Sequence, residues 1–124
     1  MSSMGSTVNF TAEDSGFIIE ADGKKLRVSY DEFKGNHEDV MKFCKEQGGG
    51  DETVENLRFI AKHRDIINEE LKKLGKEPLI GWYWVNEIIW YGEDCAFVVN
   101  VNYGFVHYGR ACNNNYYARA VKGL

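Results

Sequence analysis

The stretch that decides the fold is residues 81–121, GWYWVNEIIWYGEDCAFVVNVNYGFVHYGRACNNNYYARAV, which holds eleven of the chain's seventeen Phe, Trp and Tyr residues. Residues 95–101 alternate as a strand does, whereas the later part mixes Tyr, Phe, His, Gly and Asn with neither the strand nor the helix period. Such a mixture suits a binding face on a rigid scaffold, because Tyr gives a large contact area at low entropy cost while Asn and Gly adapt.

Five short strands are expected in this part of the chain, at residues 81–84, 87–91, 95–101, 105–108 and 116–121, with Gly-, Asn- and Asp-containing turns between them. Alternation places Trp82 and Trp84 on one face, and a Trp pair on a strand is usually core. The other residues that we expect in the scaffold are Val99, Val101, Val106, Arg119 and Val121.

The residues before this stretch predict a hairpin followed by helices. Residues 16–21 and 25–30 flank Asp22-Gly23, which is a strong hairpin signal. Asn36 is an expected N-cap for a helix at 37–47, Asp51 for a second at 52–62, and a third helix at 65–74 ends before Gly75. Helices in the middle and strands at both ends predict an α+β fold whose N-terminal hairpin pairs near the C-terminal strand.

Length and charge limit the classes of protein to consider. The 124 residues suit one domain, which we expect at 16–124 after a Ser/Gly-rich, disordered leader at 1–15. The net charge is −4 without a basic block, so nucleic-acid binding is not expected. No apolar run is long enough to span a membrane, and the first ten residues lack the pattern of a signal peptide.

Cysteine and histidine spacing predicts neither a metal site nor a cofactor. Cys44, Cys95 and Cys112 show no CxxC pattern; free thiols are favoured, and a Cys95–Cys112 bridge is the alternative. The three histidines, His37, His63 and His107, lie on three different expected elements without an HxH or HExxH spacing. His107 with Cys112 would make a thiolate pair, but no third orienting group is indicated.

Several aromatic and amide residues do not fit a core. Burying so many amides would require a partner for each, and leaving the aromatic rings together in water would create an exposed patch of the kind that marks binding sites. The alternative is a loop-rich end that is merely rich in Tyr and Asn. The candidate ligand-binding residues are Trp90, Tyr91, Asn102, Tyr103, Phe105, His107, Tyr108, Gly109, Ala111, Cys112, Asn113, Asn115 and Tyr116.

Three segments carry a family resemblance. They are KHRDIINEELKKLGKEPLIGWYW at 62–84, AFVVNVNYG at 96–104 and YYARAV at 116–121. Together they resemble the bacterial C-type lectin-like domain at the C-terminus of collagen-like adhesins, over residues 51–121. The family's usual Tyr-Trp-Ser-Ser-Thr-Glu is replaced by Trp-Tyr-Trp-Val-Asn-Glu at 82–87. The calcium-binding Glu-Pro-Asn and Trp-Asn-Asp motifs of lectins are absent, so calcium-dependent sugar binding is not expected.

A narrower resemblance is to the variable proteins diversified by retroelements, which are often carried by phages and use the same lectin-like fold. Adenine mutagenesis of Asn codons yields Tyr, Phe, His, Gly, Ala, Cys, Ser and Asp. Residues 100–121 contain Tyr, Phe, His, Gly, Ala and Cys from this set and unaltered Asn, but no Lys, Glu, Gln, Met or Trp. The resemblance implies an invariant scaffold that displays a diversified ligand-binding face.

The expected function is therefore non-catalytic binding of a protein or glycan receptor, with the cell surface or a phage particle as the favoured location. One alternative is a structural or assembly domain of a surface or phage-tail protein. A less favoured alternative is an enzyme of the formylglycine-generating type, which would need a pair of reactive cysteines in a cleft.

Overall fold

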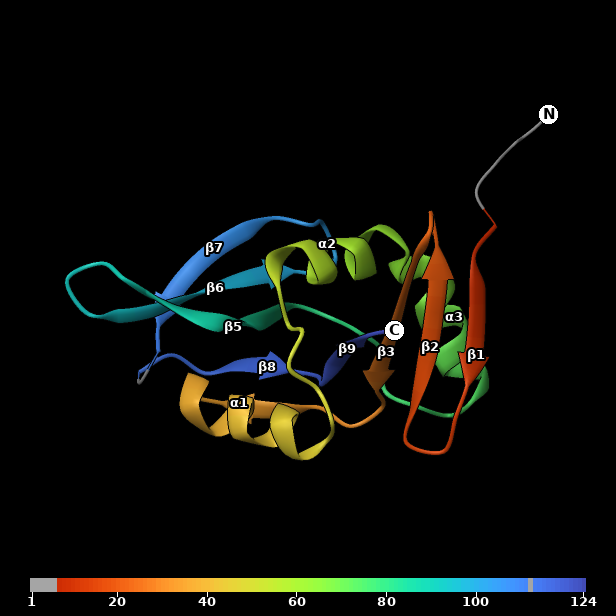
Figure 1. The fold of residues 1–124 in the computed structure, drawn as a ribbon, viewed down its shortest axis with the longest axis horizontal. Helices are drawn as coiled ribbons and strands as arrows, with labels where there is room; N and C mark the ends of the chain where they lie inside the picture. The colour runs from red at the N-terminus through yellow and green to blue at the C-terminus, as the bar shows by residue number, and fades with distance from the viewer. Residues whose placement is uncertain (1–6, 112) are drawn as a thin grey trace.

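The computed structural model describes residues 7–111 and 113–124, which form two sheets and three helices in an α+β arrangement (Figure 1). The four-stranded sheet has the order β1 (Asn9–Ala12), β2 (Gly16–Ala21), β3 (Lys24–Ser29) and β9 (Val121–Gly123). The five-stranded sheet has the order β4 (Phe33–Gly35), β8 (Tyr116–Ala118), β5 (Trp82–Trp90), β6 (Asp94–Asn100) and β7 (Val106–Arg110). The helices are α1 (His37–Glu46), α2 (Val54–Lys62) and α3 (Arg64–Lys73).

The four-stranded sheet confirms the predicted hairpin. Asp22 and Gly23 turn with positive φ angles of 53° and 77°, as a tight hairpin turn requires. The C-terminal strand β9 pairs antiparallel with β3, so the N-terminal hairpin and the chain's end meet as predicted. The expected leader is wrong for residues 9–12, because they form β1 along β2 and Phe10 stacks on Phe17 at 4.9 Å. Residues 1–6 of that leader lie outside the described residues.

In the five-stranded sheet, one long strand, β5, replaces the two strands expected at 81–84 and 87–91. Its pairing with β6 is interrupted between Trp84 and Ile88, where the backbone N–H of Asn86 donates to the carbonyl of Glu52 at 2.7 Å. The strand expected at 116–121 is split between the two sheets as β8 and β9. The chain passes from one sheet to the other between these strands. There the N–H of Ala120 donates to the Ser29 hydroxyl at 3.0 Å.

Both faces of the five-stranded sheet are covered, and each has its own core. Tyr83, Val99 and Val101 belong to the larger core, with residues of α2, α3 and the four-stranded sheet. Trp84, Ala96 and Val98 form the smaller core with α1. Trp84 is fully buried and Trp82 only partly, so at least one of the pair is core, as predicted. Val106 was expected in the scaffold and is exposed, because β7 is the outer strand of the sheet.

The helices lie close to their predicted positions. Asn36 caps α1 as predicted, and its Oδ1 accepts the N–H of Asp39 at 2.9 Å. The predicted cap of the second helix is wrong: Thr53 caps α2, with its hydroxyl 3.1 Å from the N–H of Asn56. Asp51 instead pairs with β9, where its carboxylate accepts the N–H of Gly123 at 2.7 Å. Asp51 is thereby tied to the C-terminal strand, and the helix begins at Val54, two residues later than predicted.

Two buried charged residues fix the chain's end to the scaffold. The Glu52 carboxylate accepts the backbone N–H groups of Gly50 and Val121 at 2.9 and 2.8 Å. The Arg119 side chain is almost fully buried, as its expected scaffold role requires, and its Nε lies 2.8 Å from Glu32. Buried charges need such partners because an unpaired one costs several kcal/mol of stability, roughly. The backbone that carries the candidate site is thereby held rigidly.

Candidate functional site

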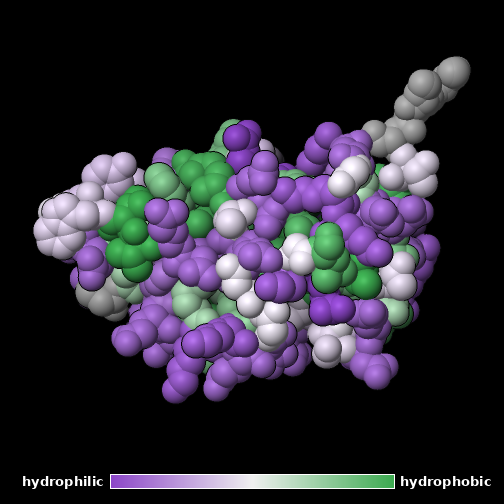
Figure 2. Space-filling model, viewed as in Figure 1, coloured by the Kyte–Doolittle hydropathy of each residue, from purple (hydrophilic) through white to green (hydrophobic). Residues whose placement is uncertain are grey.

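Five of the predicted site residues are large exposed aromatic side chains. They are Trp90, Tyr91, Tyr103, Phe105 and Tyr108, which are 71%, 58%, 74%, 62% and 56% exposed. All five lie on β5, β7 or the turns at the ends of β6, and we call them the aromatic surface. Figure 2 shows pale and hydrophobic side chains gathered at the end of the molecule where Figure 1 places the β5–β6 hairpin. Exposed aromatic groups of this kind usually mark a binding site.

The aromatic surface has two parts at opposite ends of β6. Tyr91 and Tyr108 pack together at the β5–β6 hairpin, with ring centroids 4.8 Å apart. Tyr103 and Phe105 stack at 5.7 Å in the turn between β6 and β7. Tyr108 lies opposite Phe97, midway along β6, so it is three residues and about 10 Å from Phe105, at the usual rise of a strand. The exposed strand β7, with Val106 and His107, runs between them.

The predicted residues also divide between the two faces of the sheet. Tyr108 is the cross-strand partner of Phe97, which packs on the larger core, so it lies on the α2 side. His107 is the partner of Val98 in the smaller core and therefore lies on the α1 side. There its ring meets Trp82 edge to face at 5.3 Å. A flat ligand would contact one of these faces but not both.

Three predicted residues contribute to the scaffold. Gly109 and Ala111 are buried, and Ala111 lines the hollow beside Trp90 that is described below. A Cβ atom added to Gly109 would lie 2.8 Å from the ring of Tyr116. Tyr116 is itself only partly exposed and packs edge to face on Trp84 at 4.9 Å. Gly109 thus provides the space in which Tyr116 covers the smaller core.

The amides mostly serve the backbone. Asn102 accepts the N–H of Gly81 at 2.8 Å through its side chain, and its carbonyl oxygen accepts from Arg64. Asn114 accepts the N–H of Arg110 at 2.8 Å. Asn113 and Asn115 are exposed, and the prediction for Cys112 falls outside the described residues. Turn amides that bond to their own backbone are common.

A hollow beside Trp90 was missed by sequence reasoning. It encloses about 660 Å³ between the start of α1 and the β5–β6 hairpin, with Ile88 and Trp90 exposed in its lining. Glu38 and Asp94 also line it, and Glu93 pairs with Arg110 at 2.7 Å. Its two sides are separated by some fifty residues of sequence, so no local pattern could have indicated it.

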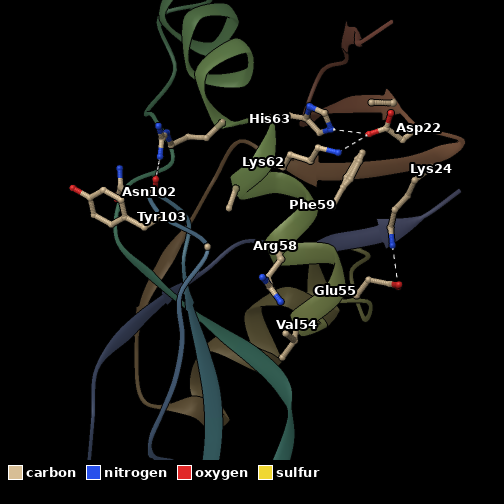
Figure 3. Close-up of a pocket in the computed structure, with 14 residues that line it drawn as sticks. Asp22, Lys24, Val54, Glu55, Arg58, Phe59, Lys62, His63, Asn102 and Tyr103 are labelled. Carbon is tan, nitrogen blue, oxygen red and sulfur yellow. Dashed lines mark hydrogen bonds and ion pairs between the residues drawn. The ribbon is translucent and has the colours of Figure 1, made fainter. Parts of the chain in front are cut away.

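A larger groove lies between α2, the β2–β3 hairpin and the β6–β7 turn, and encloses about 930 Å³ (Figure 3). Tyr103, a predicted site residue, forms one side of it with Asn102 and Gly104. The opposite sides carry charged groups from α2, its junction with α3 and the β2–β3 hairpin. They include Asp22, Lys24, Glu55, Arg58, Lys62, His63 and Arg64.

The histidines occupy three separate elements or junctions, as predicted. His37 is buried with its Nε2 2.7 Å from the Val85 carbonyl, and burial lowers its pKa against the opposing effect of backbone hydrogen bonds. His63 is buried at the α2–α3 junction, and His107 is exposed on β7. In the described residues, no group of three or more His, Cys, Asp or Glu side chains could hold a metal ion.

Cys44 and Cys95 are free and buried, in agreement with the preference for free thiols. Burial, and secondarily the charge of Glu52, raises the pKa of Cys44, which disfavours the reactive thiolate. Within residues 7–111 and 113–124, no helix is long and apolar enough to cross a membrane.

Comparison with known proteins finds no matching family model, no matching curated protein and no matching solved structure.

Proposed function

We propose that this chain is a ligand-binding module with a C-type lectin-like fold, which recognises a protein or glycan receptor through the aromatic surface. The observation that carries the proposal is the exposure of Trp90, Tyr91, Tyr103, Phe105 and Tyr108 on β5, β7 and the turns at the ends of β6. A stable fold gains little from leaving five large aromatic side chains in water. A partner gains greatly from covering them.

Two features support the lectin-like assignment. The α+β pattern predicts that the N-terminal hairpin pairs near the C-terminal strand, as a lectin-like domain of this class would allow, and β3 pairs with β9 in this way. The resemblance implies that an invariant scaffold carries a variable face. Here the backbone around the face is tied to the scaffold by Asn102, Glu52 and Arg119, whereas the aromatic side chains project from it.

The same features suit binding by a few rigid anchors. Tyr and Trp side chains lose little entropy on binding, and interfaces obtain most of their affinity from a few such residues. The pairs Tyr91–Tyr108 and Tyr103–Phe105 are already in contact, so each presents a preformed surface. Asn113 and Asn115 add adaptable polar groups nearby. The retroelement resemblance leads us to propose that the surface is diversified among related chains.

Binding is favoured over catalysis of the formylglycine-generating type. That chemistry needs reactive cysteines, whereas Cys44 and Cys95 are both buried and the pKa of Cys44 is raised. The free edge of β7 supports a second candidate, an assembly domain, because an unpaired strand edge can add a strand from another subunit. Sedimentation of the purified chain distinguishes receptor binding from assembly. A defined oligomer that dissociates when the exposed aromatic residues are substituted would favour assembly.

The test uses a tetramerised form of the chain on glycan and cell-surface-protein arrays. A variant with alanine at Tyr91, Tyr103, Phe105 and Tyr108 should lose the array signals of the unmodified chain while keeping its melting temperature within about 3 °C, since exposed positions contribute little stability. The control carries alanine at Ile66 and Ile80, which are exposed on α3 and in the loop before β5. Equal binding by both variants, or equal loss from both, would overturn the proposal.

The encoding DNA tests the diversified part separately. We expect a near-identical repeat of the last coding segment beside a reverse transcriptase gene, with differences confined to adenines. Differences spread over all four bases would contradict diversification and leave the binding test unaffected.

A further inference from the structure

The groove between α2, the β2–β3 hairpin and the β6–β7 turn carries an excess of positive charge. Four permanent cations line it, from Lys24, Arg58, Lys62 and Arg64, against the two carboxylates of Asp22 and Glu55. The groove is therefore positively charged, although the whole chain has a net charge of −4. Such a concave, cationic region attracts an anionic ligand.

Three of the four cations are already engaged by the protein. Lys24 pairs with Glu55 at 3.0 Å, and Lys62 pairs with Asp22 at 3.1 Å. Arg64 pairs with Asp65 and donates to the carbonyl of Asn102. These contacts fix the sides of the groove, as Figure 3 shows for the first two.

Arg58 differs from its neighbours. In the part of the chain that the structure describes, its guanidinium has neither a hydrogen-bond partner nor an ion-pair partner. Figure 3 draws it on the side of α2 that faces the turn carrying Tyr103. An Arg side chain offers a planar set of donors that matches the two oxygens of a carboxylate.

His63 provides an independent indication of a ligand. Its side chain is 9% exposed, and its Nε2 is a buried polar atom without a hydrogen-bond partner among the described residues. The nearest carboxylate oxygen, on Asp22, is 3.6 Å away, which is too long for a hydrogen bond. Buried polar atoms are nearly always satisfied, so an orphan in the lining of a groove indicates that something else supplies its partner.

An aromatic ring of α2 also lines the groove. Phe59 packs on His63 with ring centroids 4.8 Å apart. Tyr103 lines the groove from the β6–β7 turn, and its ring points away from α2 in Figure 3. The Phe59 ring can cover the flat apolar face of a ligand. The volume of about 930 Å³ is at the upper end of ligand sites in proteins, so it admits more than an inorganic ion.

We infer that this groove is a second binding site, for a small molecule that carries a carboxylate on a ring-shaped body. Arg58 holds the carboxylate, the ring lies against Phe59, and a polar group of the ligand satisfies His63 Nε2. Sugar acids and the free carboxyl end of an aromatic residue share this chemistry. Tyr103 lines the groove and also belongs to the aromatic surface, whereas the three residues assigned to the ligand, Arg58, Phe59 and His63, lie on α2 or at its end.

The test is a titration of the isotope-labelled chain followed by amide chemical shifts. The probes are N-acetylneuraminic acid and N-acetyltyrosine, each compared with its methyl ester, which removes the charge and keeps the ring. At least one acid should bind saturably and shift the amides of Arg58 and His63. Its ester should bind about tenfold or more weakly, because the charge-assisted bond to Arg58 is lost.

Matched variants assign the effect to the groove. Arg58→Gln should weaken binding of the acid by about tenfold or more. Lys45→Gln removes a positive charge from the last turn of α1, outside the groove, and should leave binding unchanged. Both variants should keep the well-dispersed spectrum of the folded chain.

The two acids also distinguish the sources of the ligand. Binding of the sugar acid alone points to an acidic glycan, and binding of N-acetyltyrosine alone points to a peptide carboxyl end; either result supports the carboxylate site. Equal binding of acid and ester, unchanged binding by Arg58→Gln, or no saturable binding of either acid would overturn it.

Discussion

The Nε atom of Arg119 lies 2.8 Å from Oε1 of Glu32, and the Tyr83 hydroxyl donates to the same oxygen at 2.6 Å. A second nitrogen of Arg119 donates to the carbonyl of Glu77 at 2.9 Å. This buried arrangement joins the segment before β4, the loop before β5 and the chain between β8 and β9. Strand β5 carries Trp90 of the aromatic surface, and β8 lies next to β5 in the sheet. The geometry of that surface therefore depends on Arg119 and Glu32, which lie outside it.

Replacing Glu32 by Gln should destabilise the fold by about 2–3 kcal/mol, because it leaves the buried Arg119 without a countercharge. Urea unfolding measures the loss. The control is Glu55→Gln, which breaks an ion pair with Lys24 whose acidic side chain is 84% exposed. That change should cost less than about 1 kcal/mol. Similar losses from both variants would show that the Arg119–Glu32 pair has no special role.

Glu52→Gln should loosen the C-terminal strand. The Glu52 carboxylate accepts three N–H groups, from Gly50, Val121 and the Asn86 side chain. In the variant, the NH2 group of Gln faces one of these N–H donors, so that hydrogen bond is lost. The loss should cost about 1–3 kcal/mol of stability. Hydrogen exchange at the Val121 amide should accelerate by about tenfold or more. Glu87→Gln, on an exposed part of β5, should leave that rate unchanged.

The stability of the fold should fall in mild acid because of His37. Burial lowers its pKa in the folded chain below the usual 6.5, so the unfolded chain binds the proton more readily. The contribution of neutral His37 to the free energy of unfolding is fully present above about pH 6.5. It is lost as the pH falls through the lowered pKa of His37 in the folded chain. Urea midpoints between about pH 7 and pH 5 measure this slope. It should be reduced in His37→Gln; an equal slope would mean that other groups cause it.

Tyr116 and Tyr103 should respond differently to alanine, although both are predicted site residues. Tyr116→Ala removes a ring that packs on Trp84 at 4.9 Å and should cost about 2–3 kcal/mol. Tyr103 is 74% exposed, and its substitution should change stability by about 0.5 kcal/mol or less. Thermal unfolding compares them directly. Equal effects would contradict the division between scaffold and surface.

Gly109→Ala should destabilise the fold through Tyr116. The added Cβ would lie 2.8 Å from the Tyr116 ring, which must move off Trp84 at a cost of about 1–3 kcal/mol. In the background of Tyr116→Ala the same change should be nearly neutral. A double-mutant cycle measures this coupling, and additive losses would exclude it.

Local patterns predicted much of the fold. The turn at Asp22-Gly23, the Asn36 cap and the strand near 95–101 follow from signals within a few residues of one another. The cap of α2 could not be predicted in this way. Asp51 satisfies the local rule for a cap, but its carboxylate is drawn to Gly123, which is 72 positions away. A distant partner therefore outweighed a local preference.

For the candidate site, composition alone indicated that residues 81–121 carry an unusual aromatic face, because no core or solvated loop needs that mixture. The sequence could not show which of these aromatic side chains are exposed and which pack on the core. Tyr108 and Tyr116 are the same residue type, yet Tyr108 stands exposed on an outer strand and Tyr116 covers Trp84. Burial depends on what packs against each side chain, and the partners come from β5, β6 and α1. Only the tertiary structure decided which aromatic residues are exposed, and only it brought Arg58, His63 and Tyr103 around one groove.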